Sequence, residues 1–202
     1  VGGLMYDLPC EETFQKMVSN FIDIRMPKAI GDIESLLNTN RIFIDRLEGI
    51  GTITKEDATA WSLTGPLARA SGVTRDLRKD DPFLCFEDNW DSQGAKPVEF
   101  QVPIATTGDC LARYHIRLEE MKQSCHIIRQ LIHNIPSGAI DVLPGGGIQI
   151  PSKDKVYNSI EGTIQQFELF MPNRGWESPI GECYAAIEGP NGEYGFFIVS
   201  DG

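Results

Sequence analysis

Two residues in a long helical pattern have the types and spacing that could bind a metal ion. His115 and Glu119 are four positions apart, so a helix would place them on one face. A zinc site needs three or four ligands, and no further ligand follows at a recognisable spacing. His126 and His133 stand beside apolar positions, where an ordinary hydrogen-bonded histidine is the simpler interpretation. The sequence therefore predicts no metal site.

The sequence contains no motif that is typical of nucleotide binding or of a catalytic nucleophile, so it predicts no cofactor-binding or catalytic residue. The run Gly145-Gly146-Gly147 lacks the strand-GxGxxG-helix context of a dinucleotide site, and neither a Walker motif nor a GxSxG elbow occurs. The five cysteines form no CxxC pair and are odd in number, which favours a reducing compartment over a disulfide framework.

Charged residues are the remaining candidates, and they gather in two places. Arg113 and Arg117 lie one helical turn apart and alternate with Glu119 and Glu120. The loop 63–83 carries a second group, made up of Arg69, Arg75, Asp76, Arg78, Lys79, Asp80 and Asp81. Each group is either solvated surface charge, which stabilises little, or a buried network on a rigid scaffold. The residue pattern leaves both interpretations open.

A single long helix over residues 108–134 must position most of these charges. Asp109 can cap its start, and Pro136 stands just beyond its end. At 1.5 Å per residue this helix is roughly 35–40 Å long, enough to cross a domain. Its predicted apolar stripe consists of Leu111, Tyr114, Leu118, Met121, Cys125, Ile128 and Ile132. We expect it to be the central helix of a bundle.

Shorter elements precede the long helix. Helical spacing from Glu11 predicts two segments or one helix kinked at Pro27, and Arg41–Leu47 fits a helix or a strand. Thr54 and Asp57 predict a capped short helix, anchored by Trp61 and Leu63. The alternation of Val98-Glu99-Phe100-Gln101-Val102 predicts a strand.

The C-terminal third has a different pattern. Apolar spacing predicts a helix over about 155–170, and Asn191-Gly192 between two alternating segments predicts a hairpin over about 181–200. The fold class is therefore α+β and mainly helical. We expect a helical bundle portion, 1–135, that contains the charged loop 63–83, and an α+β portion, 136–202.

Composition narrows the classes of partner. The 202 residues carry a formal net charge of −11, and no cluster of Lys and Arg with interleaved aromatics interrupts it, which argues against nucleic acid. Nothing approaches 18 consecutive apolar residues, so no membrane span is expected, although a peripheral position on a membrane partner is compatible with the sequence.

The charged loop and the long helix also carry a family resemblance. LTGPLARASGVTRDLRKDDPF and EFQVPIATTGDCLARYHIRLEEMKQS are similar to the large core (D, quinone-site) subunit of respiratory complex I, NADH:quinone oxidoreductase. The same register runs from Val1-Gly2-Gly3 to Ser200-Asp201-Gly202 and covers essentially the whole chain. That family shares its fold with the large subunits of nickel–iron hydrogenases, a helical bundle flanked by small antiparallel β elements.

The resemblance implies an activity that belongs to a complex. Electrons from NADH pass through FMN and iron–sulfur clusters in partner subunits, and quinone is reduced beside the terminal cluster in a cavity shared with this subunit. Quinone reduction is coupled to proton translocation. The implied partners are the subunit with the terminal cluster and the membrane-arm subunit at the quinone entrance. The implied location is peripheral, on the cytoplasmic face of the bacterial inner membrane or the mitochondrial matrix face.

The site residues implied by the resemblance are supporting ones. Gly2 and Gly3 match a loop near the terminal cluster. A structural and interface network is expected from the charged loop and the central helix, comprising Arg75, Asp76, Arg78, Lys79, Asp109, Arg113, Arg117 and Glu120. The family's quinone-binding histidine and tyrosine fall before Val1, so the chain alone is expected to be inactive. Asn191 replaces a basic residue common in relatives.

Two other interpretations remain open. One is a related membrane-bound hydrogenase, or another respiratory dehydrogenase built on the same module. Paired CxxC motifs outside this stretch would reveal a hydrogenase. The other is a non-catalytic scaffold subunit of the same fold, which would lack the upstream histidine and tyrosine.

Overall fold

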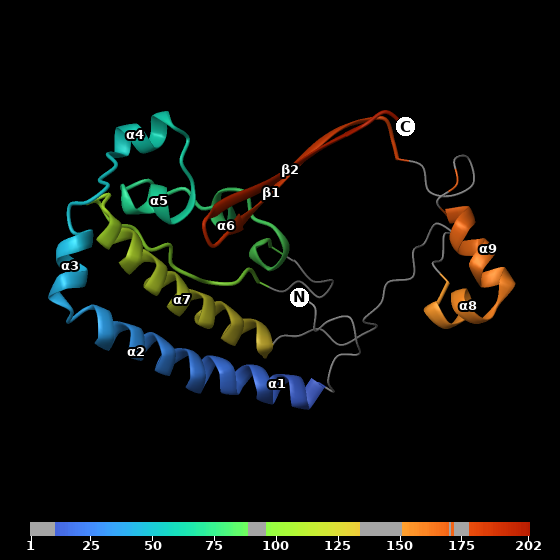
Figure 1. The fold of residues 1–202 in the computed structure, drawn as a ribbon, viewed down its shortest axis with the longest axis horizontal. Coiled ribbons are helices and arrows are strands. Elements are labelled where there is room, and N and C mark those ends of the chain that lie inside the picture. The colour runs from blue at the N-terminus through green and yellow to red at the C-terminus, as the bar shows by residue number, and fades with distance from the viewer. Residues whose placement is uncertain (1–10, 89–95, 134–150, 170, 172–177) are drawn as a thin grey trace. The chain divides into compact units, whose positions relative to one another are not determined.

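The structure is a computed structural model that describes residues 11–88, 96–133, 151–169, 171 and 178–202 (Figure 1). These residues are mainly helical and end in an antiparallel β-hairpin, which confirms the predicted fold class. They form two compact units. The first holds the described residues up to 133 and Ala186–Tyr194, and the second holds those from 151 to 185 and Gly195–Gly202. The predicted boundary near residue 135 lies outside the described residues.

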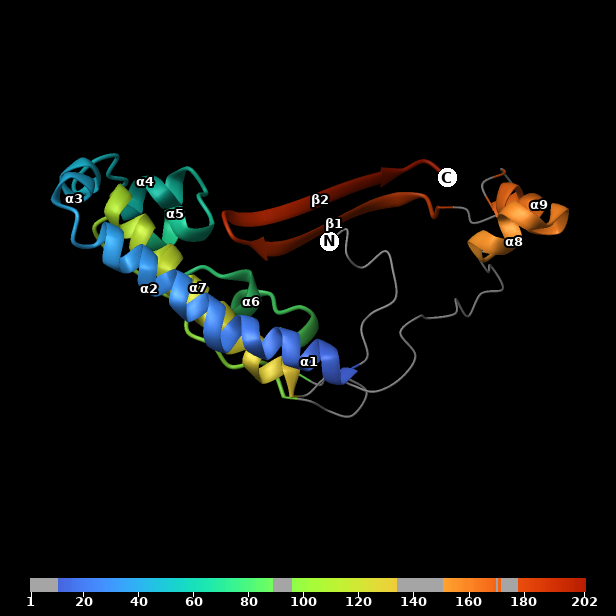
Figure 2. The same cartoon turned by 60° about the horizontal axis from the view of Figure 1, so that its bottom comes forward.

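A long helical rod and the central helix form the framework of the first unit. The rod consists of α1 (Glu11–Asn20), a π-helical turn η2 (Phe21–Arg25) and α2 (Met26–Leu37), and it runs antiparallel to α7 (Cys110–Ile132) (Figures 1 and 2). The rod is continuous, as one of the two expectations had it, and contains a π-helical turn just before Pro27. Pro27 has no N–H for the carbonyl four residues earlier, and the helix widens there, with Met26 N–H bonding to Phe21 O.

The predicted cap of α7 is confirmed, whereas its predicted stripe is only partly buried. Asp109 Oδ1 accepts a hydrogen bond from Ala112 N at 2.8 Å. Neighbours on more than one side, the rod and α5, contact the helix, so burial follows no single row. Leu118, Cys125 and Ile132 of the predicted stripe are buried, and Ala112, Ile116 and Ile127 are buried beside them. Leu111, Tyr114, Met121 and Ile128 are half-buried.

Side-chain caps fix where the two short helices before α5 begin. Arg41–Leu47 is the helix α3, because the Asn40 side chain accepts from Ile42 N and Phe43 N. The predicted cap of α4 (Lys55–Ala60) is confirmed, since Thr54 Oγ1 accepts from Asp57 N at 3.1 Å. The prediction that Trp61 anchors this helix was wrong, because Trp61 is 77% exposed. Leu63, the other predicted anchor, is half-buried, and Ala58 is the buried residue of α4.

The predicted strand at 98–102 was also wrong. This segment has no strand partner among the described residues and lies along α7 instead (Figure 1). Gln130 Oε1 accepts from Glu99 N at 3.0 Å, while its Nε2 donates to Glu99 O at 2.7 Å. Gln123 Oε1 accepts from Gln101 N at 3.0 Å. Amide side chains of a helix thus supply the hydrogen bonds that a neighbouring strand would have supplied.

Three short helical elements connect α4 to this segment, and the hairpin follows later in the chain. They are α5 (Gly65–Ala70), α6 (Leu77–Asp80) and the 3-10 turn η3 (Leu84–Phe86). The predicted hairpin is formed by β1 (Gly181–Gly189) and β2 (Gly192–Ser200). Its turn is Pro190-Asn191 rather than Asn191-Gly192: Gly192 has φ +130°, and Asn191 does not have a positive φ.

The second unit contains two helices where one was predicted. They are α8 (Lys153–Asn158) and α9 (Ile160–Leu169), separated by Ser159 in an extended conformation. Ser159 Oγ accepts from Gly162 N at 3.0 Å and so restarts the helix. Among all the described residues, no helix is long and apolar enough to cross a membrane.

Candidate functional site

Arg69 is an almost completely buried charged residue of α5, the short helix that packs against α7. It lies near the end of α5 between Ala68 and Ala70, both 0% exposed, and is itself 1% exposed. Ala70 packs with Ala112 and Ile116 of α7, so α5 is pressed against the central helix. This packing carries the guanidinium into the interior, where a charge needs partners.

The guanidinium of Arg69 joins three carboxylates from three elements. Its Nε and Nη2 contact Glu120 Oε1 of α7 at 2.9 and 2.6 Å. Its Nη1 contacts Glu188 Oε1 of β1 at 2.9 Å and Asp76 Oδ2 before α6 at 3.5 Å. The same nitrogen donates to Arg75 O at 3.3 Å. We call Arg69, Asp76, Arg78, Glu120 and Glu188 the ionic cluster.

Asp76 is held by a second arginine as well. Arg78 Nε and Nη2 donate to its two oxygens at 2.9 and 2.6 Å, in the bidentate geometry that suits a guanidinium. Burial alone would raise the pKa of Asp76, but the hydrogen bonds and charge of Arg78 and the charge of Arg69 outweigh it and lower that pKa. The Arg78 guanidinium also lies over the ring of Phe100, 4.6 Å from its centroid.

The tip of the hairpin forms hydrogen bonds with the bundle next to the ionic cluster. Leu77 N donates to Glu188 Oε2 at 3.3 Å, and Thr64 Oγ1 accepts from Glu193 N at 3.1 Å. Gly65 and Gly192 let the two backbones approach closely, since a Cβ on Gly65 would overlap the Cα of Gly192. Arg75 Nη2 contacts Glu193 Oε2 at 3.1 Å at the exposed edge. The tip therefore packs as part of the first unit.

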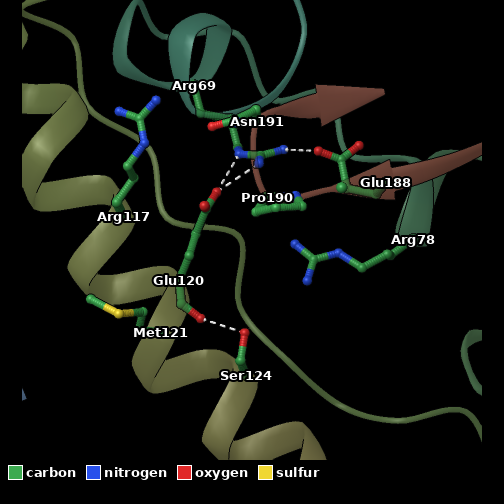
Figure 3. A pocket seen from close by; sticks show the side chains of 10 residues that line it. Arg69, Arg78, Arg117, Glu120, Met121, Ser124, Glu188, Pro190 and Asn191 are labelled. Atoms are coloured by element: carbon green, nitrogen blue, oxygen red, sulfur yellow. Dashed lines mark hydrogen bonds and ion pairs between the residues drawn. The ribbon is translucent and has the colours of Figure 1, made fainter. Parts of the chain in front are cut away.

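A pocket of about 510 Å³ opens beside the cluster (Figure 3). In Figure 3, Arg117 extends from α7 towards the hairpin turn, and Arg78 approaches from the other side of Pro190. Glu120, Met121 and Ser124 of α7 form the wall below. The pocket thus combines cationic and anionic side chains with the apolar Met121 and Pro190, and all of its lining residues belong to the first unit.

Two of the predicted network residues form a separate joint at the start of α7. Asp109 Oδ2 accepts from Gly49 N at 2.9 Å, besides capping the helix. Burial alone would raise the pKa of Asp109, but the N–H groups of Gly49 and Ala112 and the hydroxyl of Thr107 lower it. Arg113 Nη2 donates to Gly51 O and to Gly108 O, which ties the loop before α4 to the helix.

The other predicted network residues either belong to the ionic cluster, lie beside it or are exposed to solvent. Glu120, Asp76 and Arg78 belong to the ionic cluster, and Arg75 pairs with Glu193 beside it. Arg117 is exposed and donates only to Arg113 O of its own helix, at 3.3 Å, among the hydrogen bonds of the described residues. Lys79 is exposed above the Phe100 ring. Gly2 and Gly3 lie outside the described residues.

Sequence reasoning missed Arg69 as the centre and Glu188 as its partner in the hairpin. The only local signal for Arg69 is its position between two alanines in a short helix, a setting that suits a buried face. Nothing near Glu188 indicates burial. Over the part of the chain that the structure covers, no three His, Cys, Asp or Glu residues group to hold a metal, and His115, His126 and His133 are exposed.

Comparison with known proteins places the chain in a family. Residues 1–202 match the family described as the respiratory-chain NADH dehydrogenase, 49 Kd subunit. The D 1 subunit of the NADH-quinone oxidoreductase of Opitutus terrae is 44% identical over the whole chain. The D subunits of the same oxidoreductase in Methylacidiphilum infernorum and Akkermansia muciniphila are 43% and 42% identical over the same 202 residues.

The match is complete for this chain and partial for the relatives. The chain spans 44% of the length of the Opitutus terrae protein and 45% of the other two. The resemblance first noted in the charged loop and the long helix is confirmed along the entire chain. This chain belongs to the family of the 49 kDa subunit of respiratory-chain NADH dehydrogenase.

Proposed function

We propose that this chain is part of the quinone-reducing core subunit of an NADH:quinone oxidoreductase. In this role it helps to form the quinone cavity beside the terminal iron–sulfur cluster of a partner subunit, and electron transfer there is coupled to proton translocation. The observation that carries the proposal is the family match over all 202 residues, together with relatives named as the D subunit of that oxidoreductase. Quinone is the substrate, and FMN and the iron–sulfur clusters reside in partner subunits.

The proposed contribution of the described residues is architectural. The ionic cluster joins α5, α6, α7 and the hairpin tip through one buried guanidinium, and such a joint fixes the surfaces that neighbouring subunits contact. The proposed neighbours are the subunit with the terminal cluster, approached by Gly2 and Gly3, and the membrane-arm subunit at the quinone entrance. The protein would then lie peripherally on the cytoplasmic or matrix face of the membrane.

The test uses the full-length subunit in its membrane complex. We expect it to purify with an NADH-oxidising, quinone-reducing assembly, and Arg69→Ala to reduce the amount of assembled complex. The turnover of each complex that still assembles should stay near the wild-type value, because Arg69 is buried against carboxylates of its own chain and its proposed role is architectural. The chain of 202 residues alone should show no quinone reductase turnover. Robust turnover from that purified chain would contradict the proposal.

A further inference from the structure

Arg117 differs from the other arginines beside the pocket in having no carboxylate partner. Arg69 and Arg78 are paired with carboxylates of the ionic cluster, whereas no carboxylate oxygen lies within 4 Å of the Arg117 guanidinium among the residues that the structure describes. Its hydrogen bond to Arg113 O uses one nitrogen of the guanidinium. Arg117 lines the pocket, and in Figure 3 no dashed line joins its guanidinium to another of the residues drawn. The other nitrogens of the guanidinium are therefore open to a further acceptor.

Asn191 provides a second free polar group on the same pocket. Its side chain is exposed at the hairpin turn and makes none of the hydrogen bonds recorded for the described residues. Asn191 and Arg117 lie on the same side of Pro190 in Figure 3. Arg117 and Asn191 both line the pocket, and a guanidinium fork and an amide N–H are donors that suit a carboxylate.

The local charge count limits what can bind there. Three arginines and two glutamates line the pocket, and Asp76, which pairs with Arg69 and Arg78 behind them, brings the local charges into balance. A free anion in solution therefore gains little there. An exposed arginine gains at most about 1 kcal/mol from a small ion in water. The pair becomes strong only when the occupant covers it and removes the water, as a protein surface does. The apolar rim of Met121 and Pro190 beside an arginine has the composition of an interface contact.

We propose that this pocket receives an aspartate or glutamate side chain of a partner subunit, which pairs with Arg117 and is bounded by Asn191. The inference rests on the proposed function, because it requires a complex. It also separates Arg117 from the cluster that stabilises the fold: Arg117 holds the neighbour, and Arg69 holds the bundle.

Arg117→Lys supplies the test in the assembled complex. The variant keeps the positive charge and supplies a primary amine that can react with a carboxylate activated by a carbodiimide. The reagent activates a carboxylate, the amine attacks to form an amide, and the carbodiimide leaves as a urea. We expect mass spectrometry to find an amide between the new amine and an Asp or Glu of another chain. Native Lys122, with its Nζ 2.9 Å from Glu34 Oε1, is the internal positive control.

Arg41→Lys is the matched control, because Arg41 is 92% exposed on α3 and pairs only with Asp45 among the described residues. Its amine should link within the chain or remain free. Links from position 117 that are confined to this chain, or absent while Lys122 reacts, would overturn the proposal.

Charge reversal gives a second readout. Arg117→Glu should lower the yield of assembled complex by about tenfold or more, because like charges then meet in the covered pocket. Arg41→Glu should leave that yield unchanged. Assembly of Arg117→Glu at the wild-type level overturns the carboxylate contact and leaves the proposed function intact. A wild-type protein that joins no NADH-oxidising complex would instead contradict the proposed function.

Discussion

Helix α7 carries two kinds of ion pair, and they differ in burial rather than in residue type. Towards α5 and the hairpin tip, Glu120 meets the 1%-exposed Arg69. Elsewhere on the helix, Lys122 contacts Glu34 and Glu119, and Arg129 contacts Asp23 at 2.6 Å. The Lys122 and Arg129 side chains are 41% and 46% exposed. Water screens these outer pairs, so their distances, although equally short, say little about stability.

The buried ion pairs differ from the exposed ones because their charges have been removed from water. Removing charges from water is costly, and the cost is offset only if every charge keeps its partners. The members of the ionic cluster therefore depend on one another: loss of Arg69 leaves Glu120 and Glu188 without a cation, and Asp76 keeps only Arg78. The outer pairs fail one at a time and at little cost.

Arg69→Ala should have the largest effect on the free energy of unfolding. It leaves Asp76, Glu120 and Glu188 without their shared cation, which should cost about 3–5 kcal/mol. Chemical denaturation of the purified protein measures the change. Combining Arg69→Met with Glu120→Gln and Glu188→Gln should recover part of the loss, because the unpaired charges are then gone. A loss for Arg69→Ala no larger than that for Lys122→Ala would remove the distinction between the two regions.

Asp109→Ala should have an intermediate effect. The variant loses the α7 cap and the bond from Gly49 N, and caps of this kind contribute about 0.5–2 kcal/mol. Asp109→Asn keeps an oxygen acceptor and should lose less. Thermal unfolding of the two variants against wild type checks the order. Equal melting temperatures for wild type and Asp109→Ala would mean that water replaces both bonds at no cost.

Acid should weaken the buried cluster through Asp76. The pKa of Asp76 is lowered in the folded protein, so its contribution is present above the ordinary aspartate pKa and is lost as pH falls through the folded value. The unfolded chain takes up its proton at about pH 4, and stability should fall below that pH. Denaturation midpoints from neutral pH down through this range measure the slope, and Asp76→Asn should reduce it. An unchanged slope in that variant would assign the acid sensitivity to other carboxylates.

Lys122→Ala should have the smallest effect, within about 1 kcal/mol, because both of its ion pairs are exposed. Added salt should shrink this small difference further, whereas the Arg69→Ala loss should persist in salt. Thermal melts at low and high ionic strength provide the comparison. A larger loss from Lys122→Ala than from Arg69→Ala would reverse the assignment of the two regions.

Local patterns predicted the elements well where each rule involves only neighbouring residues. The caps Asp109 and Thr54, the long helix and the hairpin follow from types and spacings within a few positions. The prediction of a strand at 98–102 was wrong because an alternating pattern shows only that the two faces of a segment differ. It does not show what the backbone bonds to, and here the partners are glutamine side chains of α7. The stripe of α7 was incomplete because a helix packed from more than one side buries residues outside one row.

The candidate site shows the same limit more strongly. Sequence placed Asp76, Arg78 and Glu120 among the charged candidates but gave Arg117 the same standing, although it is exposed and the others are largely buried. Burial depends on which segments pack over a residue. One of the segments that pack over Arg69 is the hairpin, whose Glu188 lies 119 positions later in the sequence.

The amino-acid sequence by itself determined the helices, their caps, the terminal hairpin and the family, because these depend on residue types at short spacing or in one continuous register. The tertiary structure alone decided that Arg69 is the centre of the ionic cluster and that Glu188 reaches it. The physical reason is that a buried charge is defined by contacts between distant segments, and those contacts exist only after α5, α7 and the hairpin tip have packed together.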